Sequence, residues 1–466
     1  MLRKGIAALA ALLVTAAYAV SASAVELTAG RIRAFQQNML TVTSDDGGRL
    51  TIEVVNGTLS LENAVTDLWI PGGTLEIPWE ALTYGGEPIS PGTVTLRATL
   101  RGSDRTVEQT EITAEVGSPV PAALCCLPAA QRFYADGKSS LRIEAALSAA
   151  GNCEISISPR DNPDEVIWHD RQNIAGEEPG TFRWNGRDRK RQICPPGDYV
   201  ISVWSRACPE QVKTAEITLT AEPLPEAKLT VTGSLIPEDL NDDAAVWEAL
   251  TAPVAVGEGP EGQGLRIMKE KGSRSGVAGT VACRTVGLAI LETDDDGWVK
   301  VGAWRQGDGY YLEGYVKADK LTMIRPNTRY GAVVDKNAQR MTVYEAGRKI
   351  GTVAVSTGLT TAEDRKADTH SGVFLLGTRM EDFTQDGHVY CYPIRIDCFN
   401  LIHQIGFARE GAGRNFDEEI ATLGSKASHG CIRVDARITE ESNGINAWWI
   451  WTHMGHDTKI IVTPEE

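Results

Sequence analysis

The sequence predicts a mainly β protein built from several domains, and three observations lead to this prediction. The chain has 466 residues, which is more than a single hydrophobic core usually serves. Short segments in which apolar and polar residues alternate, the pattern of half-buried strands, recur along most of its length. Turn formers separate these segments, and the chain holds 46 glycines. Only residues 446–454 (NAWWIWTHM) indicate a helix, just before the closing strand.

The N-terminus has the pattern of an export signal. Arg3 and Lys4 precede an apolar run at 5–20, which is too short to span a bilayer comfortably and ends in an A-x-A cleavage pattern. We predict that residues 1–24 are a signal peptide and that the mature chain begins at Val25. The protein is then expected in the cell wall or periplasm, with no membrane anchor after cleavage.

The charge of the chain argues against two classes of partner. Its formal net charge is −16, and it becomes −18 when cleavage removes Arg3 and Lys4. Nucleic acid phosphates and anionic lipids repel a strongly acidic protein. We therefore expect no nucleic acid partner and no tight docking on anionic lipid.

Cysteines in an exported chain usually form disulfide bridges. An odd number leaves one thiol over, and the many pairings of the other eight cannot be assigned from sequence. Cys391 and Cys398 lie close together in one loop-like segment, and we expect these two to pair. The nine positions are Cys125, Cys126, Cys153, Cys194, Cys208, Cys283, Cys391, Cys398 and Cys431.

Two N-terminal segments resemble each other, which indicates a duplicated domain. Trp79 and Trp184 stand 105 residues apart, and a Pro-Gly turn followed by an alternating strand recurs at the same spacing. We predict two antiparallel sandwiches, at 25–117 and 118–224, with both tryptophans in their cores. The second copy contains W-N-G-R-D and P-P-G-x-Y, and it resembles immunoglobulin-like modules of the flagellar-hook-capping type. We expect both sandwiches to act as spacers.

An acidic, proline-containing stretch at 225–249 is predicted to be a linker. After it, residues 250–325 contain short alternating strands with tight turns, which favour a small barrel. The order of Gly297-Trp298-Val299-Lys300-Val301 and Gly314-Tyr315-Val316 resembles a bacterial SH3-type domain. That resemblance implies binding of cell-wall peptides, and the alternative is a spacer with Trp298 in its core.

Cys431, in the stretch SKASHGCIRVDA, has three possible roles. A zinc site would need partners at ligand spacing, but His429 is only two residues away and the chain has no C-x-x-C pair. A disulfide is the second alternative. The third is a nucleophile: a thiol has a pKa of about 8.5 and needs a neighbouring base, which His403 or His429 would supply. We predict no metal and no cofactor.

The last domain, at 326–466, supplies the decisive pattern. Consecutive hairpin strands open it, and A-S-H-G-C-I-R-V follows near its end. This segment resembles the active-site motif of L,D-transpeptidases of the YkuD type. The resemblance implies a mainly β catalytic domain in which Cys431 is the nucleophile and His403 the general base. It also implies that His429 and Gly430 shape the turn, with backbone N–H groups placed for a developing oxyanion.

Two further residues take roles from the same resemblance. Ser428 and Arg433 frame the turn, and Arg433 would hold a substrate carboxylate or only brace the loop. Two departures stand out. The 24 residues between His403 and Ser428 are more than the family usually has, and the segment 369–374 lacks the proline common in its T-P-x-G-x-F turn.

The reaction implied by the resemblance is exchange of one amide for another on peptidoglycan stem peptides. Cys431 would form a thioester with release of D-Ala, and an amine would resolve it into a 3→3 cross-link. Water in place of the amine would make the protein an L,D-carboxypeptidase. A non-catalytic wall-binding protein is an alternative from another class. A papain-like protease is disfavoured, because its histidine would follow the cysteine in sequence.

Overall fold

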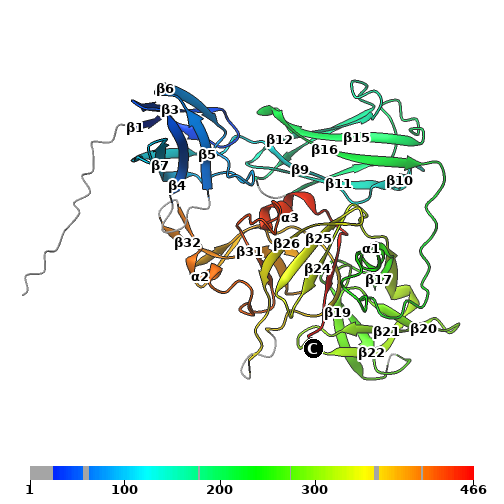
Figure 1. Ribbon diagram of the computed structural model, residues 1–466. Coiled ribbons are helices and arrows are strands. Elements are labelled where there is room, and N and C mark those ends of the chain that lie inside the picture. Colours follow the sequence, from blue (N-terminus) through cyan, green and yellow to red (C-terminus); the bar gives the residue numbers. More distant parts are fainter. Residues whose placement is uncertain are drawn as a thin grey trace, which may run out of the picture.

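The structure is a computed structural model that describes residues 25–55, 62–176, 179–272, 274–361, 367–410 and 413–465. The signal peptide predicted at 1–24 lies outside these residues. The described part is mainly β, as predicted, with three short α-helices. None of these helices is long and apolar enough to cross a membrane. Figure 1 shows two β units side by side above a C-terminal sheet, with a small barrel beside it.

The two N-terminal units have the same strand order. Each pairs a three-stranded sheet with a five-stranded one, in the orders β1-β3-β6 with β2-β8-β7-β4-β5, and β9-β11-β14 with β10-β16-β15-β12-β13. The first unit contains β1 (Val25–Ala29), β2 (Ile32–Arg33), β3 (Asn38–Ser44), β4 (Gly48–Val55), β5 (Glu62–Ile70), β6 (Gly73–Trp79), β7 (Gly92–Gly102) and β8 (Val107–Gly117). The second contains β9 (Ala123–Pro128), β10 (Arg132–Tyr134), β11 (Leu141–Leu147), β12 (Gly151–Pro159), β13 (Trp168–Ile174), β14 (Gly180–Trp184), β15 (Gly197–Ser205) and β16 (Cys208–Thr220).

Equivalent tryptophans anchor the two units. Trp79 is 6% exposed and Trp184 is fully buried, which confirms their place in the cores. Each indole N–H donates to the carbonyl three residues on, that of Leu82 or of Arg187. The shared strand order and hydrogen bond are what duplication of one domain would produce, and the immunoglobulin-like identity of the units stays a prediction.

The segment after the sandwiches differs from the predicted linker. Helix α1 (Asp243–Thr251) begins inside 225–249, because Asp242 caps its first N–H groups and Val246 and Leu250 are buried. Periodicity missed this helix because it is short, with only nine residues. The predicted barrel consists of a two-stranded sheet, β17-β23, and a five-stranded sheet, β19-β18-β22-β21-β20. Its elements are β17 (Val254–Gly257), β18 (Gly264–Met268), β19 (Val277–Ala282), β20 (Ala289–Thr293), β21 (Trp298–Trp304), β22 (Tyr311–Lys317) and β23 (Leu321–Ile324), with a 3-10 turn at Ala318–Lys320. Its SH3-type identity stays a prediction.

The C-terminal unit is built on an eight-stranded sheet in the order β27-β35-β24-β25-β26-β34-β31-β30, beside a four-stranded sheet β28-β29-β32-β33. The helix expected at 446–454 is confirmed as α3. The elements are β24 (Tyr330–Asp335), β25 (Arg340–Glu345), β26 (Arg348–Ser356), β27 (Gly372–Leu375), β28 (Phe383–Gln385), β29 (His388–Tyr390), β30 (Ile394–Arg395), β31 (Leu401–Gln404), β32 (Phe407–Glu410), β33 (Gly413–Asn415), α2 (Asp417–Ile420), β34 (Ile432–Val434), α3 (Ala447–His453) and β35 (Lys459–Val462).

Both sandwiches dock on this C-terminal unit, and the expectation that they act as spacers stays a prediction. Arg379, 4% exposed, pairs with Glu144 of the second sandwich at 2.7 Å and donates to two carbonyls at the C-terminal end of α3. Glu87 of the first sandwich pairs with Arg414 and accepts from the Tyr392 hydroxyl at 2.5 Å. Charges buried in this way require their partners, which holds the units together.

The prediction of a disulfide between Cys391 and Cys398 is wrong, because all nine cysteines are free thiols in this structure. Cys391 is buried beside Asp382, whereas the thiol of Cys398 faces the barrel and donates to the carbonyl of Gly262 at 3.0 Å. The two side chains therefore face different neighbours although they are close in sequence.

Candidate active site

Cys431 and His403 belong to neighbouring parallel segments. β31 and β34 pair with Ile402 opposite Ile432 and His403 opposite Arg433. Cys431 lies two residues before Arg433, and side chains two apart on an extended chain point to the same face. The pairing thus brings the candidate nucleophile and the candidate base to one face of the sheet, at the start of β34.

The turn before β34 holds Cys431 through its backbone and its sulfur. The Ser428 hydroxyl donates to the Cys431 carbonyl at 2.5 Å and accepts from the Gly430 N–H at 3.1 Å. On the other side, the Leu401 N–H donates to the Cys431 sulfur at 3.4 Å. A donor on the sulfur favours its anionic form. The oxyanion role of the Gly430 N–H stays a prediction, since Ser428 accepts from that group here.

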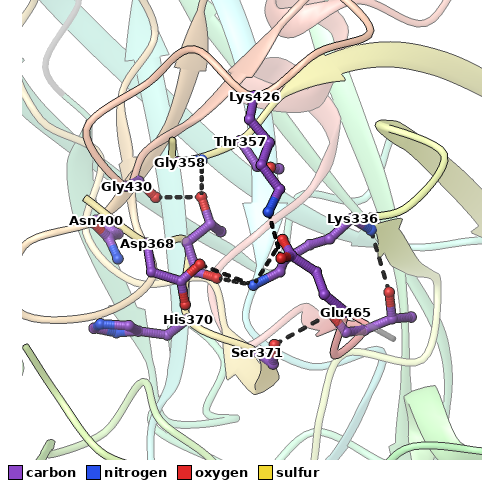
Figure 2. A network of polar contacts seen from close by, with 12 residues as sticks. Lys336, Thr357, Gly358, Asp368, His370, Ser371, Asn400, Lys426, Gly430 and Glu465 are labelled. Carbon is purple, nitrogen blue, oxygen red and sulfur yellow. Dashed lines mark hydrogen bonds and ion pairs between the residues drawn. The ribbon is translucent and has the colours of Figure 1, made fainter. Parts of the chain in front are cut away.

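Glycine is required at position 430. Its φ is +119°, a conformation that residues with a Cβ rarely adopt. A Cβ there would collide with Oδ1 of Asn400 and would lie 3.1 Å from the Asp368 carbonyl. The Thr369 hydroxyl donates to the Gly430 carbonyl at 2.7 Å, so a second side chain, besides Ser428, holds the turn. Figure 2 shows Asn400 and Gly430 beside a network of polar contacts, in which Asp368 pairs with the buried Lys336.

His403 is a buried imidazole with a defined tautomer. Its side of β31 is covered by Tyr390 and Phe383, whose rings meet the imidazole edge-on at 5.0 and 5.4 Å. Its Nδ1 lies 2.7 Å from the Gln404 carbonyl, which can only accept, so Nδ1 carries the hydrogen and Nε2 keeps its lone pair. Burial lowers the pKa of His403 to about 4, and Arg433 adds to this, against the opposing bond to Gln404.

The thiol is neutral as well. Burial raises the pKa of Cys431 above its ordinary value, and the Leu401 N–H acts in the opposite direction. At neutral pH the free protein therefore holds a thiol and an uncharged imidazole. In the predicted role of a nucleophile, the sulfur would lose its proton as it attacks, which is general-base catalysis and does not need a preformed thiolate.

Arg433 and His429 differ in their surroundings. Arg433 pairs with Glu419 at 2.9 Å and lies over the Tyr390 ring at 5.4 Å, so its guanidinium is engaged within the protein. His429 is exposed on the turn. Neither the substrate carboxylate proposed for Arg433 nor a catalytic part for His429 is tested by these contacts, and both roles stay predictions.

The extra residues between His403 and Ser428 fold into β32, β33 and α2. β32 and β33 are two of the strands of the four-stranded sheet, and α2 supplies Glu419, the partner of Arg433. Because β31 and β34 pair directly with each other, this insertion leaves the Cys431 turn next to β31. The longer spacing therefore does not separate the two candidate residues.

Comparison with known proteins supplies the family of this unit. Residues 329–462 match the family model of the YkuD L,D-transpeptidase catalytic domain. This part of the chain is a YkuD domain. The chain is also similar to solved L,D-transpeptidases from Mycobacterium smegmatis (15% identity over 44% of this chain and 100% of the other, TM-score 0.24) and Mycobacterium tuberculosis H37Rv (14%, 45% and 98%, 0.24). A third similar structure is L,D-transpeptidase 3 of Mycobacterium tuberculosis with a faropenem-derived adduct (16%, 50% and 89%, 0.22). No curated protein matches the chain.

Sequence reasoning missed several residues around the turn of the YkuD domain. Asp397, His370 and Thr369 all contact the turn or its supporting loop, and Glu419 holds Arg433. The segment 369–374, where the family proline is missing, was the one available signal for His370 and Thr369. Nothing in the sequence marked the pairing of Asp397 with His370 or of Glu419 with Arg433, because these partners are 27 and 14 positions apart along the chain.

The turn of the YkuD domain predicts a strong effect of Gly430→Ala. Placing a Cβ at this positive φ costs about 1–3 kcal/mol of stability, and the clash with Asn400 should displace Cys431 and slow turnover. Thermal melts and turnover assays measure the two effects. Gly424→Ala is the matched control, because its φ is +79° but its Cβ would meet nothing within 4 Å. Equal loss of turnover in both variants would contradict the clash argument.

The low pKa of His403 predicts the dependence on pH. If the neutral imidazole acts as the predicted base, kcat/KM should hold as the pH falls through 6.5 and decline only near pH 4. Over the same interval His403 destabilises the fold, because it binds a proton below pH 6.5 when unfolded but only below about pH 4 when folded. A pH–rate profile measures the first effect, and comparing melts of wild type and His403→Gln measures the second. An acid limb centred near pH 6.5 would contradict the prediction.

Proposed function

We propose that the chain is an exported peptidoglycan L,D-transpeptidase that forms 3→3 cross-links through a thioester on Cys431. The YkuD match supplies the class of reaction. The observation that carries the residue roles is the direct pairing of β31 with β34, which joins a buried, tautomer-defined His403 to the Cys431 turn. The export pattern at 1–24 supports action outside the cytoplasm.

In the first step the Cys431 sulfur attacks the carbonyl at the L-centre of the third residue of a tetrapeptide stem. His403 Nε2 takes the thiol proton and returns it to the nitrogen of the leaving D-Ala, so a thioester forms as the amide breaks. In the second step a side-chain amine of another stem attacks the thioester. His403 then takes a proton from that amine, and Cys431 leaves as a thiol. One amide replaces another, so no external energy source is needed.

The rigid backbone around Cys431 favours formation of a reactive Michaelis complex. Ser428 and Thr369 hold the backbone around Cys431, so the sulfur is positioned before substrate arrives. Arg433 is proposed to brace the turn through Glu419. Its further role toward a substrate carboxylate would require that pair to open.

The test is mass spectrometry of residues 25–466 incubated with a disaccharide-tetrapeptide. A dimer lighter by one D-Ala than two monomers supports transpeptidation. Tripeptide without dimer would identify the same site as an L,D-carboxypeptidase. Absence of any change across several stem types would contradict both, and would favour a wall-binding protein whose sandwiches and barrel do the binding.

A further inference from the structure

A second buried histidine lies close to the Cys431 turn, and the proposed reaction does not use it. We propose that His370 and Asp397 form a positioning pair that holds the Cys431 turn against β31. This inference rests on the proposed function, because it takes Cys431 as the nucleophile. His370 lies just before β27 and Asp397 lies before β31, so the pair joins two segments of the chain that both contact the turn.

Asp397 is a buried carboxylate with four hydrogen bonds. Its Oδ1 accepts from the backbone N–H groups of Phe399 and Asn400, at 2.7 and 2.6 Å. Its Oδ2 lies 3.1 Å from the Asn400 amide and 2.9 Å from His370 Nδ1. Asp397 is 2% exposed and His370 is 5% exposed. Loss of a donor would leave the buried charge of Asp397 uncompensated, so its pair with His370 holds the loop in its shape.

The loop that Asp397 shapes delivers two groups to the turn. Oδ1 of Asn400 occupies the place next to Gly430 that a Cβ would otherwise fill. The next residue, Leu401, donates its N–H to the Cys431 sulfur. A shift of the loop therefore moves the hydrogen-bond donor of the nucleophile, and it also moves the start of the strand that carries the proposed base.

His370 approaches Asp397 from the other flank of the turn. Its neighbour Thr369 donates to the Gly430 carbonyl, so one short segment contacts both the turn and the loop. The barrel packs over this segment, since a Cβ on Gly309 would lie 3.3 Å from the His370 ring. Among the described residues, Nε2 of His370 is buried with no hydrogen-bond partner. The bond to Asp397 is thus what orients the ring.

The test compares two substitutions of His370 in the chain 25–466. His370→Leu removes the donor to Asp397, whereas His370→Asn keeps an amide N–H near the position of Nδ1. We expect His370→Leu to lower kcat by about a hundredfold with KM nearly unchanged, as for a misplacement of about 1 Å. Alkylation of Cys431 by iodoacetamide, followed by peptide mass spectrometry, should slow about tenfold, the effect of one hydrogen bond to a charged sulfur. His370→Asn should recover most of both rates.

Two further variants complete the design. His169→Leu is the matched control, because His169 also pairs with a buried carboxylate, Glu154, but in the second sandwich. It should leave both rates at the wild-type level. Should His370→Leu fail to fold, Asp397→Asn removes the charge with little change of shape, and a similar fall of kcat is expected.

Two results overturn the proposal: unchanged rates in a folded variant that has lost the pair, or a His370→Asn variant as slow as His370→Leu. The alkylation measurement needs no substrate. If the wild-type protein converts no muropeptide, the proposed function fails, and the alkylation rates still decide whether the pair positions Cys431.

Discussion

Replacing Cys431 with alanine should abolish thioester formation and cross-linking while leaving the protein folded. In the proposed mechanism the sulfur is the atom of the protein that bonds covalently to the substrate. Its loss therefore removes the covalent route, and activity should fall on the order of 10⁴-fold or more. The side chain is small and half-buried, so its removal leaves little cavity behind. Mass spectrometry of the muropeptide reaction and circular dichroism of the variant measure the two parts of this result.

Cys194→Ala is the control for loss of a thiol as such. Cys194 is buried in the second sandwich, 5% exposed, and the proposed reaction gives it no role. Its variant should turn over substrate at the wild-type rate. A folded Cys431→Ala protein that still releases D-Ala would show that another group carries the chemistry.

Replacing His403 with glutamine should lower turnover by about 10²–10⁴-fold, the usual contribution of a positioned general base. Because the Cys431 thiol has a raised pKa, little thiolate exists at neutral pH without a base. The deficit should therefore shrink as the pH rises toward the pKa of the thiol, where hydroxide supplies the deprotonated sulfur. Single-turnover rates of acylation between about pH 6 and about pH 10 measure this convergence.

His453→Gln is the matched control for His403. Desolvation also lowers the pKa of His453, although this residue is exposed, and it stacks on Trp449 in α3 and takes no part in the proposed reaction. It should leave the rate unchanged. A deficit in His403→Gln that stays constant at alkaline pH would contradict a base role and would indicate that His403 only shapes the site.

Local patterns predicted the parts of the fold and site that local sequence controls. Alternation identified a mainly β chain, the aromatic run before the last strand identified α3, and the spacing of Trp79 and Trp184 identified equivalent core positions. The S-H-G-C motif located the Cys431 turn because its residues are consecutive. Apart from the repeat, each of these features depends on neighbours within a few residues.

Contacts between distant residues could not be predicted in this way. Glu144 and Arg379 form a buried pair although 235 residues separate them, and neither stands in a pattern that names the other. The same holds for His370 and Asp397, which meet only when β27 and β31 take their places around the turn. A charged side chain that the fold buries needs a partner. The sequence does not identify that partner, which depends on the three-dimensional arrangement.

The docking of both sandwiches through buried ion pairs has a consequence for how the enzyme reaches its substrate. A catalytic unit on a flexible tether samples a volume set by linker length, and its encounters depend on that effective concentration. Here the ion pairs of Arg379 and Glu87 hold the units together, so the distance between the sandwich surfaces and Cys431 is fixed. On the proposed function, two stems would then have to lie within reach of this fixed arrangement, and the geometry of the wall would decide which neighbours become joined.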